Sequence, residues 1–212
     1  MYKAIIWDLD GVLIESEPFL IKAEVEIFPK FGIPLTQQIS TEYLGYKLDD
    51  YLKALEKRFN KKLPYLDIET KLNKKIEQMY DKQIPLTPHA KETLEALKNK
   101  FKFALATSRE KHLGLRILMR LDIDQYFKHR VFKEEVTKGK PDPEVFLKAA
   151  VKLEIEPNKC IVVEDAESGF KAGQAAGMFV IARKAEHNKN QNFSLADKVI
   201  EDLKEIVKLK VN

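Results

Sequence analysis

The sequence predicts an α/β fold in which helices cover both faces of a mostly parallel sheet, with an all-helical segment inserted after the first strand. Three observations lead to this prediction. A short apolar run, residues 3–7, stops abruptly at acidic residues and a glycine. Residues 16–81 then show helical periodicity and contain no convincing strand. From Pro85 onward, short apolar runs alternate with helical segments, a pattern typical of parallel sheets.

The first elements can be justified from their boundaries. Residues 3–7 are bounded by Asp8 and Gly11, which favours a buried strand that ends in a loop. Ser16-Glu17-Pro18 is typical of a helix start, with a capping hydroxyl and an early proline. Gly32-Ile33-Pro34 ends that helix. Further helices are expected from near Thr36, over 48–59 and over 68–80.

The second half of the chain repeats one strand-and-helix pattern. Thr87-Pro88 supplies a cap and a first-turn proline for a helix that continues to Asn99. The strands are expected at 101–106, 131–132, 161–163 and 179–182, and the later helices at 109–121, 143–153 and 168–176. Residues 199–200 and 203–207 are expected to add one more pair. The predicted core domain therefore comprises 1–15 and 82–212, and the inserted helical domain comprises 16–81.

Composition limits the classes of partner. The chain has 212 residues, of which 44% are apolar, enough for a packed core. The net charge of +4 arises from 37 basic and 33 acidic residues, so the basic excess is small. The lysine pairs 61–62 and 74–75 are short and flanked by acids, unlike the concentrated basic stripe of a nucleic-acid binder. We therefore expect no nucleic-acid partner.

The sequence also indicates the compartment. Cys160 is the single cysteine, so no intrachain disulfide can form, and we expect it to be buried at the edge of a strand. No apolar run approaches the roughly 18 residues of a membrane span. Asp8 and Asp10 stand where a signal peptide would be apolar. These features predict a cytoplasmic protein without a membrane partner, as a monomer or a small homo-oligomer.

Polar residues follow the predicted strands, at the point where each strand ends. In a parallel sheet these carboxyl ends meet along one edge, so four distant pieces of sequence are expected to converge. The pieces are Asp8 and Asp10 after the first strand, Thr107 and Ser108 after the second, Lys140 in a connecting loop, and Glu164 and Asp165 after the strand at 161–163.

The residue types at this edge suit one task. Several carboxylates packed together repel one another, and hard oxygen ligands of this kind favour Mg²⁺. Hydroxyls and amides of Thr107 and Ser108 can donate to phosphate oxygens, and Lys140 adds a balancing cation. Asp8 and Asp10 alternate along extended backbone, so both carboxylates can lie on one side of the strand end. One can attack phosphorus while the other protonates the leaving oxygen.

Each motif taken singly has an ordinary structural explanation. Asp8–Gly11 can form a simple turn, although a calcium loop would need ligands where Val12 and Ile14 stand. Thr107-Ser108 can cap a helix, Glu164-Asp165 can form another cap, and the Lys140 loop can be a helix entry on the surface. The joint occurrence of all four motifs, in this order, favours the functional interpretation.

Together the four motifs resemble the signature of the haloacid-dehalogenase-like superfamily, and the resemblance extends over essentially the whole chain. The matching pieces are Asp8-Leu9-Asp10-Gly11-Val12-Leu13, Ala104-Leu105-Ala106-Thr107-Ser108, Gly139-Lys140-Pro141-Asp142-Pro143, and Val163-Glu164-Asp165 with Ser168-Gly169. The resemblance implies a Rossmann-like core domain and a helical cap domain that closes over the site and touches the leaving group.

The resemblance also implies roles for the first motif and for the lysine. Asp8 would form an aspartyl-phosphate. Asp10 would act as general acid and base, and its backbone carbonyl would bind Mg²⁺. Lys140 would stabilise Asp8 and the transferring phosphoryl group.

The other motifs receive roles in the same way. Thr107 would bind the phosphoryl group with help from the amide of Ser108. Asp165 would bind Mg²⁺, with Glu164 as a further ligand or a supporting partner. Lys47 and Tyr46, in a loop of the helical insertion, are candidates for contact with the far end of the substrate.

Arg109 could also reach the substrate. For all three residues an ordinary surface position is an equally good interpretation.

The resemblance favours a phosphatase of a small phosphorylated metabolite. Dehalogenases of the superfamily lack the second acid, so Asp10 indicates phosphoryl transfer. The nearest groups are β-phosphoglucomutase, phosphoglycolate phosphatase and sugar-phosphate phosphatases. The mutase carries a histidine where this chain has Leu20, and an arginine in the loop that here is Gly45–Asp49. Simple hydrolysis is therefore favoured, while a sugar-phosphate mutase and a non-catalytic regulatory or binding protein on this fold remain alternatives.

Overall fold

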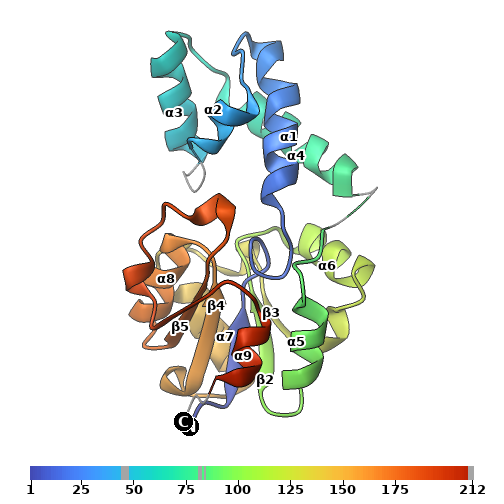
Figure 1. Ribbon diagram of the computed structural model, residues 1–212, viewed down its shortest axis with the longest axis vertical. Helices are drawn as coiled ribbons and strands as arrows, with labels where there is room; N and C mark the ends of the chain where they lie inside the picture. Colours follow the sequence, from blue (N-terminus) through green and yellow to red (C-terminus); the bar gives the residue numbers. More distant parts are fainter. Residues whose placement is uncertain (44–47, 81–82, 84, 210–212) are drawn as a thin grey trace. The chain divides into compact units, whose positions relative to one another are not determined.

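Figure 1 shows the computed structural model of the chain, in which residues 1–43, 48–80, 83 and 85–209 are described. The chain divides into two compact units. The larger unit comprises Met1–Glu15 and Pro85–Asn212, and the smaller unit comprises Ser16–Ile84. The smaller unit therefore ends at Ile84, whereas the sequence analysis places the end of the helical domain at residue 81.

The larger unit is built on a six-stranded sheet in the order β3-β2-β1-β4-β5-β6, with every neighbouring pair parallel. This confirms the predicted α/β class. The strands are β1 (Ala4–Trp7), β2 (Lys102–Ala106), β3 (His129–Val131), β4 (Cys160–Glu164), β5 (Phe179–Arg183) and β6 (Lys198–Ile200). The main helices are α5 (Ala90–Leu97), α6 (Lys111–Arg120), α7 (Glu144–Leu153), α8 (Glu167–Ala175) and α9 (Lys204–Lys208). Short 3₁₀ helices cover Asp124–Tyr126, Lys133–Glu135, Pro157–Lys159, Glu186–Asn188 and Phe193–Leu195.

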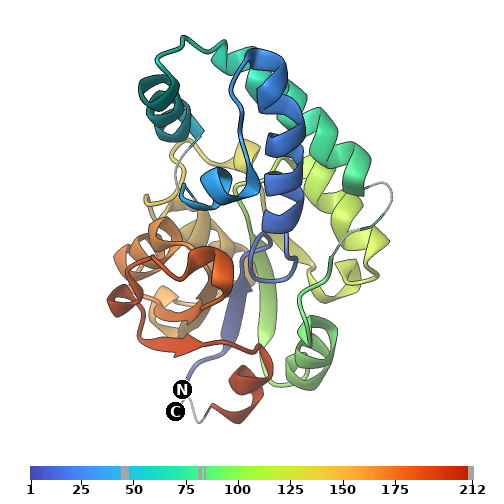
Figure 2. The ribbon, with the colours of Figure 1, turned by 45° about the horizontal axis from the view of Figure 1, so that its top comes forward.

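Successive side chains of the central strand, β1, point to opposite faces of the sheet. Ala4 and Ile6 of β1 belong to a buried cluster that also holds Phe146 of α7, so this helix covers their face. Trp7 points the other way and packs edge-on against Phe103, with ring centroids 5.7 Å apart. The helices surround the sheet in both views (Figures 1 and 2).

Strand order brings the predicted polar residues to neighbouring loops. β1 pairs with β2 on one side and with β4 on the other, in registers that end at nearly the same level. Asp8, Thr107 and Asp165 are the residues directly after these three strands. The central position of β1 therefore places the first motif between the loops that carry the second and the fourth.

Two predicted helix caps are wrong in detail. α1 begins at Glu17 as expected, but Ser16 has helical angles and its hydroxyl accepts no capping hydrogen bond. Thr87 does not cap α5, because His89, with φ 60°, occupies the position before the helix, and the buried Thr87 hydroxyl has no hydrogen-bond partner among the described residues. Thr36 does cap its helix, accepting from the amide of Ile39.

In the described part of the smaller unit, every regular element is a helix. The elements are α1 (Glu17–Ile27), the 3₁₀ helix Phe28–Phe31, α2 (Gln37–Thr41), α3 (Leu48–Phe59) and α4 (Tyr65–Tyr80). α1 and α4 contact each other along the unit (Figure 2). Their inward faces join one buried apolar cluster, with Ile27, Phe28, Leu52, Leu55 and Ile68 among its members. The unit therefore has a hydrophobic core of its own.

A carboxyl group is buried in this helical unit. Glu24 of α1 is 4% exposed; its Oε2 accepts hydrogen bonds from the hydroxyls of Ser40 and, at 3.2 Å, Tyr51. Burial raises the pKa of Glu24 from its usual 4.5 to about 7, despite both hydrogen bonds. The folded chain therefore favours the protonated form of Glu24. The stability that this protonation contributes to the fold is fully present below the pKa of Glu24 in the unfolded chain, and it is lost as the pH rises through about 7.

Replacing Glu24 with glutamine is expected to raise the free energy of unfolding at pH 8 but to change it little at pH 5. The amide oxygen can still accept from both hydroxyls, whereas the buried charge is gone. The displaced pKa corresponds to about 3 kcal/mol at high pH, and the gain should be roughly 2 kcal/mol larger at pH 8 than at pH 5. Urea unfolding at both pH values measures this, with surface Glu26→Gln on the same helix as control. Parallel pH curves for Glu24→Gln and the wild type would contradict it.

No helix within the described residues combines the length and the apolar composition that crossing a membrane requires.

Candidate active site

A buried lysine joins two of the predicted site carboxylates. The Nζ of Lys140 lies 2.6 Å from Oδ1 of Asp8 and 2.6 Å from Oε1 of Glu164. The three side chains are only 7%, 9% and 2% exposed. Burial alone would lower the pKa of Lys140, but the charges of Asp8 and Glu164 outweigh it and raise that pKa above its usual range. The ammonium group therefore stays protonated between two acids.

Asp165 lies close to Asp8 and Glu164 and forms a cluster of three acids with them. One carboxylate oxygen from each of Asp8, Glu164 and Asp165 lies within 4.8 Å of the other two. Burial raises the pKa of Asp8 well above its usual range, and the nearby negative charges raise it further. Burial and the charges of Glu164 and Asp10 act on Asp165 in the same way. The cluster thus has more negative charge than Lys140 offsets, which disfavours full ionisation unless another cation binds.

Two glycines leave room for these carboxylates. Gly11 has φ 72°, and a Cβ there would lie 1.9 Å from Oδ2 of Asp165. A Cβ on Gly169 would lie 2.0 Å from the carboxyl carbon of Glu164. Glycine at both positions is therefore required for backbone and carboxylates to approach this closely.

Asp10 is held by an arginine that comes from the next strand. The Nε of Arg109 donates to Oδ2 of Asp10 at 2.9 Å, and its Nη2 contacts Oδ1, so the pair is bidentate. The sequence offered Arg109 only as a substrate contact or a surface residue. Its pairing with Asp10 follows from the adjacency of β1 and β2, because both residues lie shortly after the ends of these strands.

Thr107 and Ser108 occupy the end of β2 as predicted. Thr107 is buried, and its hydroxyl oxygen accepts from the amide of Arg109 at 3.1 Å. Its hydroxyl hydrogen has no acceptor within the described residues, which leaves it to a ligand. Ser108 is exposed. Lys140 lies nearby, because its Nζ is 3.4 Å from the carbonyl oxygen of Ala106.

Two of the predicted substrate contacts belong to the sequence of the smaller unit. Tyr46 and Lys47 fall outside the described residues. Their assignment to the substrate stays a prediction from the sequence.

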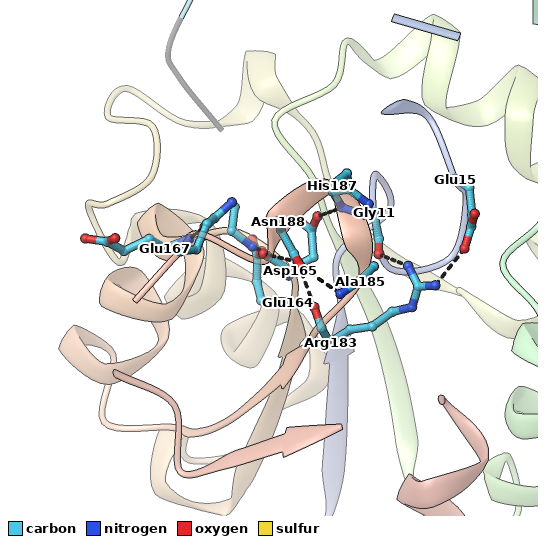
Figure 3. A network of polar contacts seen from close by, with 11 residues as sticks. Gly11, Glu15, Glu164, Asp165, Glu167, Arg183, Ala185, His187 and Asn188 are labelled. Atoms are coloured by element: carbon cyan, nitrogen blue, oxygen red, sulfur yellow. Dashed lines mark hydrogen bonds and ion pairs between the residues drawn. The ribbon is translucent and has the colours of Figure 1, made fainter. Parts of the chain in front are cut away.

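A further group of residues joins the site from the end of β5, and sequence reasoning missed it (Figure 3). Arg183 donates to the carbonyl of Gly11 and to Oε1 of Glu15, each at 2.6 Å. The Nε2 of His187 lies 2.8 Å from Oδ2 of Asp165. The rule that selected residues at the other strand ends also applies to β5, so the polar loop after that strand was the available signal.

The arrangement can support transfer of a phosphoryl group. One carboxylate, on Asp8, is poised beside a fixed ammonium group, and a second acid lies two residues along the chain. Three clustered carboxylate oxygens offer hard ligands to a divalent cation. The hydroxyl of Thr107 and the amide of Ser108 add donors for an anion.

Several known proteins are similar to this chain over most of its length. A phosphorylated carbohydrates phosphatase from Thermotoga maritima is 32% identical over 177 residues, covering 83% of this chain and 82% of the relative. A β-phosphoglucomutase from Bacillus subtilis is 32% identical over 187 residues, covering 84% of this chain and 82% of the relative. Among solved structures, a HAD family hydrolase from Deinococcus radiodurans with bound phosphate and sodium is 26% identical, with a TM-score of 0.78 and coverage of 97% and 93%.

The family itself follows from a broader match. The model for haloacid dehalogenase-like hydrolases matches residues 5–183, which span most of the first strand, the whole helical unit and the loops that carry the acidic cluster. This chain therefore belongs to the haloacid dehalogenase-like hydrolases.

Proposed function

We propose that this hydrolase is a Mg²⁺-dependent phosphatase that removes the phosphoryl group of a sugar phosphate or a similar small monoester through an aspartyl-phosphate on Asp8. The observation that carries the proposal is the Asp8–Lys140–Glu164 arrangement. A carboxylate nucleophile must stay ionised, and the site must also accept the negatively charged phosphoryl group. The buried ammonium group 2.6 Å from Asp8 favours both, because its positive charge stabilises the carboxylate and attracts the phosphoryl oxygens.

The first half of the reaction uses the two acids of the first motif. An oxygen of Asp8 attacks phosphorus, a new P–O bond forms to the carboxylate, and the ester P–O bond breaks. Asp10, protonated, gives its proton to the leaving oxygen, and the product alcohol departs. The hydroxyl of Thr107 and the amide of Ser108 bind phosphoryl oxygens, while Lys140 balances their charge.

The second half regenerates the enzyme. Asp10, now a carboxylate, takes a proton from water as the water oxygen attacks phosphorus, and the bond from phosphorus to Asp8 breaks. Inorganic phosphate leaves. Arg109 holds both oxygens of Asp10 in the structure, so its guanidinium must loosen this pair or turn with it when the acid donates its proton.

The acidic cluster fits Mg²⁺ by the chemistry of its donors. All three groups are carboxylates, which are hard oxygen ligands, and burial together with the neighbouring negative charges raises the pKa values of Asp8 and Asp165, which supports binding of a further cation. Asp8, Asp165 and the carbonyl of Asp10 would hold the ion, with Glu164 as a further ligand or a supporting partner. Mg²⁺ would supply neutralisation of charge on the phosphoryl oxygens.

The smaller helical unit is proposed to act as the cap that selects the substrate. Its separate hydrophobic core lets it behave as a body distinct from the sheet-bearing unit. A sugar phosphate is the favoured substrate class, because a relative named as a phosphorylated carbohydrates phosphatase matches 83% of this chain.

A screen of sugar phosphates and other small phosphomonoesters, scored for free phosphate, tests the function. We expect release of phosphate with no isomerised sugar phosphate, since Leu20 stands where the mutase has its histidine. Conversion of β-glucose 1-phosphate to glucose 6-phosphate in the same assay would favour the mutase. A lack of turnover on every compound with Mg²⁺ present would favour a binding protein.

Removal of divalent metal is expected to silence the enzyme. Turnover of para-nitrophenyl phosphate should fall about 100-fold or more after treatment with EDTA, because the buried carboxylates would then repel the substrate. Addition of excess MgCl₂ should restore turnover, whereas NaCl of equal ionic strength should not. Full activity in EDTA would remove Mg²⁺ from the proposal while leaving Asp8 as its nucleophile.

A further inference from the structure

We propose that His187 is a positioning residue that holds Asp165 in the orientation in which it binds the divalent cation. The inference rests on the proposed function, because it takes Asp165 as a ligand of that cation. His187 lies in the 3₁₀ helix after β5, outside the four motifs that the sequence analysis identified.

The contact fixes one oxygen of the carboxylate. The Nε2 of His187 lies 2.8 Å from Oδ2 of Asp165, and their side chains are 15% and 12% exposed. When Asp165 is ionised, as a cation ligand is, its carboxylate can only accept, so Nε2 then bears the hydrogen of this bond. The same Oδ2 occupies the space that a side chain at position 11 would fill. Oδ2 is therefore confined between the imidazole ring and the backbone of the first motif.

The other oxygen of Asp165 is left for a cation. Oδ1 accepts no hydrogen bond from the residues that the structure describes. Asp165 is also one of the three acids whose ligand oxygens gather within 4.8 Å. With one oxygen anchored, rotation of the carboxylate about its axis would break the bond to His187, so the orientation is set before any ion arrives.

The loop that carries His187 is itself fixed. Nδ2 of Asn188 donates to the carbonyls of Asp165 and Arg183, each at 2.8 Å, and its Oδ1 accepts from the amide of Ala185 at 2.7 Å (Figure 3). Asn188 is 2% exposed. This side chain ties the end of β5 to the backbone of Asp165, so the imidazole is presented from a rigid support rather than from a free loop.

The bond could instead serve only to join two loops, and the two roles predict different measurements. A positioning role predicts weaker cation binding after loss of the ring, with little change in the stability of the metal-free chain. A joining role predicts lower stability whether or not metal is present. Partners that orient metal ligands in this way typically contribute about 10–100-fold in affinity.

The test is calorimetric titration of MgCl₂ into the full chain after EDTA treatment and dialysis, with thermal unfolding of each metal-free variant. His187→Ala is expected to raise the Kd for Mg²⁺ about tenfold or more. His187→Gln, whose amide can still donate, should stay within about threefold of the wild type. His112→Ala, on the exposed face of α6, is the matched control and should not change the Kd.

Two results would overturn the inference. One is a Kd for His187→Ala within about threefold of the wild type. The other is a fall in the unfolding temperature of metal-free His187→Ala that His187→Gln does not share, which would show a joining role. Failure of the wild type to bind Mg²⁺ would be a different outcome, since it would remove the metal from the proposed function itself.

Discussion

Replacing Asp8 with asparagine is expected to lower kcat by about 10⁴-fold or more. Asparagine has nearly the same shape, and its amide oxygen can still accept from Lys140. It cannot become an acyl phosphate, because the amide nitrogen replaces one of the two carboxylate oxygens and the group carries no negative charge. Release of phosphate from para-nitrophenyl phosphate, with Mg²⁺ present, measures the loss.

The same substitution should leave the fold intact. Burial and three neighbouring acids raise the pKa of Asp8, so removal of its charge relieves repulsion and the unfolding temperature should hold or rise. Asp122→Asn is the matched control, because Asp122 also bonds a lysine, Lys91, at 2.6 Å but at the surface. Its activity should equal that of the wild type. Residual turnover above about 1% in Asp8→Asn would contradict the nucleophile assignment.

The sequence predicts the fold well because the sheet is buried on both faces. Its strands must then be short runs of apolar residues, such as Ala4–Trp7, and the helices between them must carry an apolar stripe. Caps are less predictable, because a hydroxyl caps only when the backbone of its own residue is extended. Thr36 meets that condition with ψ 163°, whereas Ser16 is already helical. No local pattern distinguishes the two.

The site was predictable to the extent that strand ends determine it. Asp8, Glu164 and Asp165 are brought together by the pairing of β1 with β4, and the alternation of strands and helices predicts that the carboxyl ends of such strands share one edge of the sheet. The bond from Arg109 to Asp10 and the bond from His187 to Asp165 depend on loop paths and rotamers. Such contacts join side chains of different loops, so no spacing within one segment could reveal them.

Replacing Lys140 with methionine is expected to reduce both activity and stability. The ammonium group faces Asp8 and Glu164 at 2.6 Å in a buried setting and lies 5.0 Å from the centre of the Phe146 ring. Methionine fills similar volume but leaves two buried acids without their cation, which typically costs about 3–5 kcal/mol in the free energy of unfolding. Turnover should fall by about 10³-fold, because charge on the transferring phosphoryl group is no longer balanced. Lys171→Met, which removes a surface ion pair with Glu167, should change stability by no more than about 0.5 kcal/mol.

Combining Lys140→Met with Asp8→Asn separates the two losses. The double variant removes one of the stranded charges together with the cation, so Asp8→Asn should raise the unfolding free energy of Lys140→Met by about 1–3 kcal/mol more than it raises that of the wild type. Its activity should remain at background, since the nucleophile is gone. Urea unfolding of the four chains, wild type, both single variants and the double, gives the coupling energy directly. Additive losses would mean that Lys140 and Asp8 do not act on each other, and the buried ion pair would then have no part in holding the nucleophile ready.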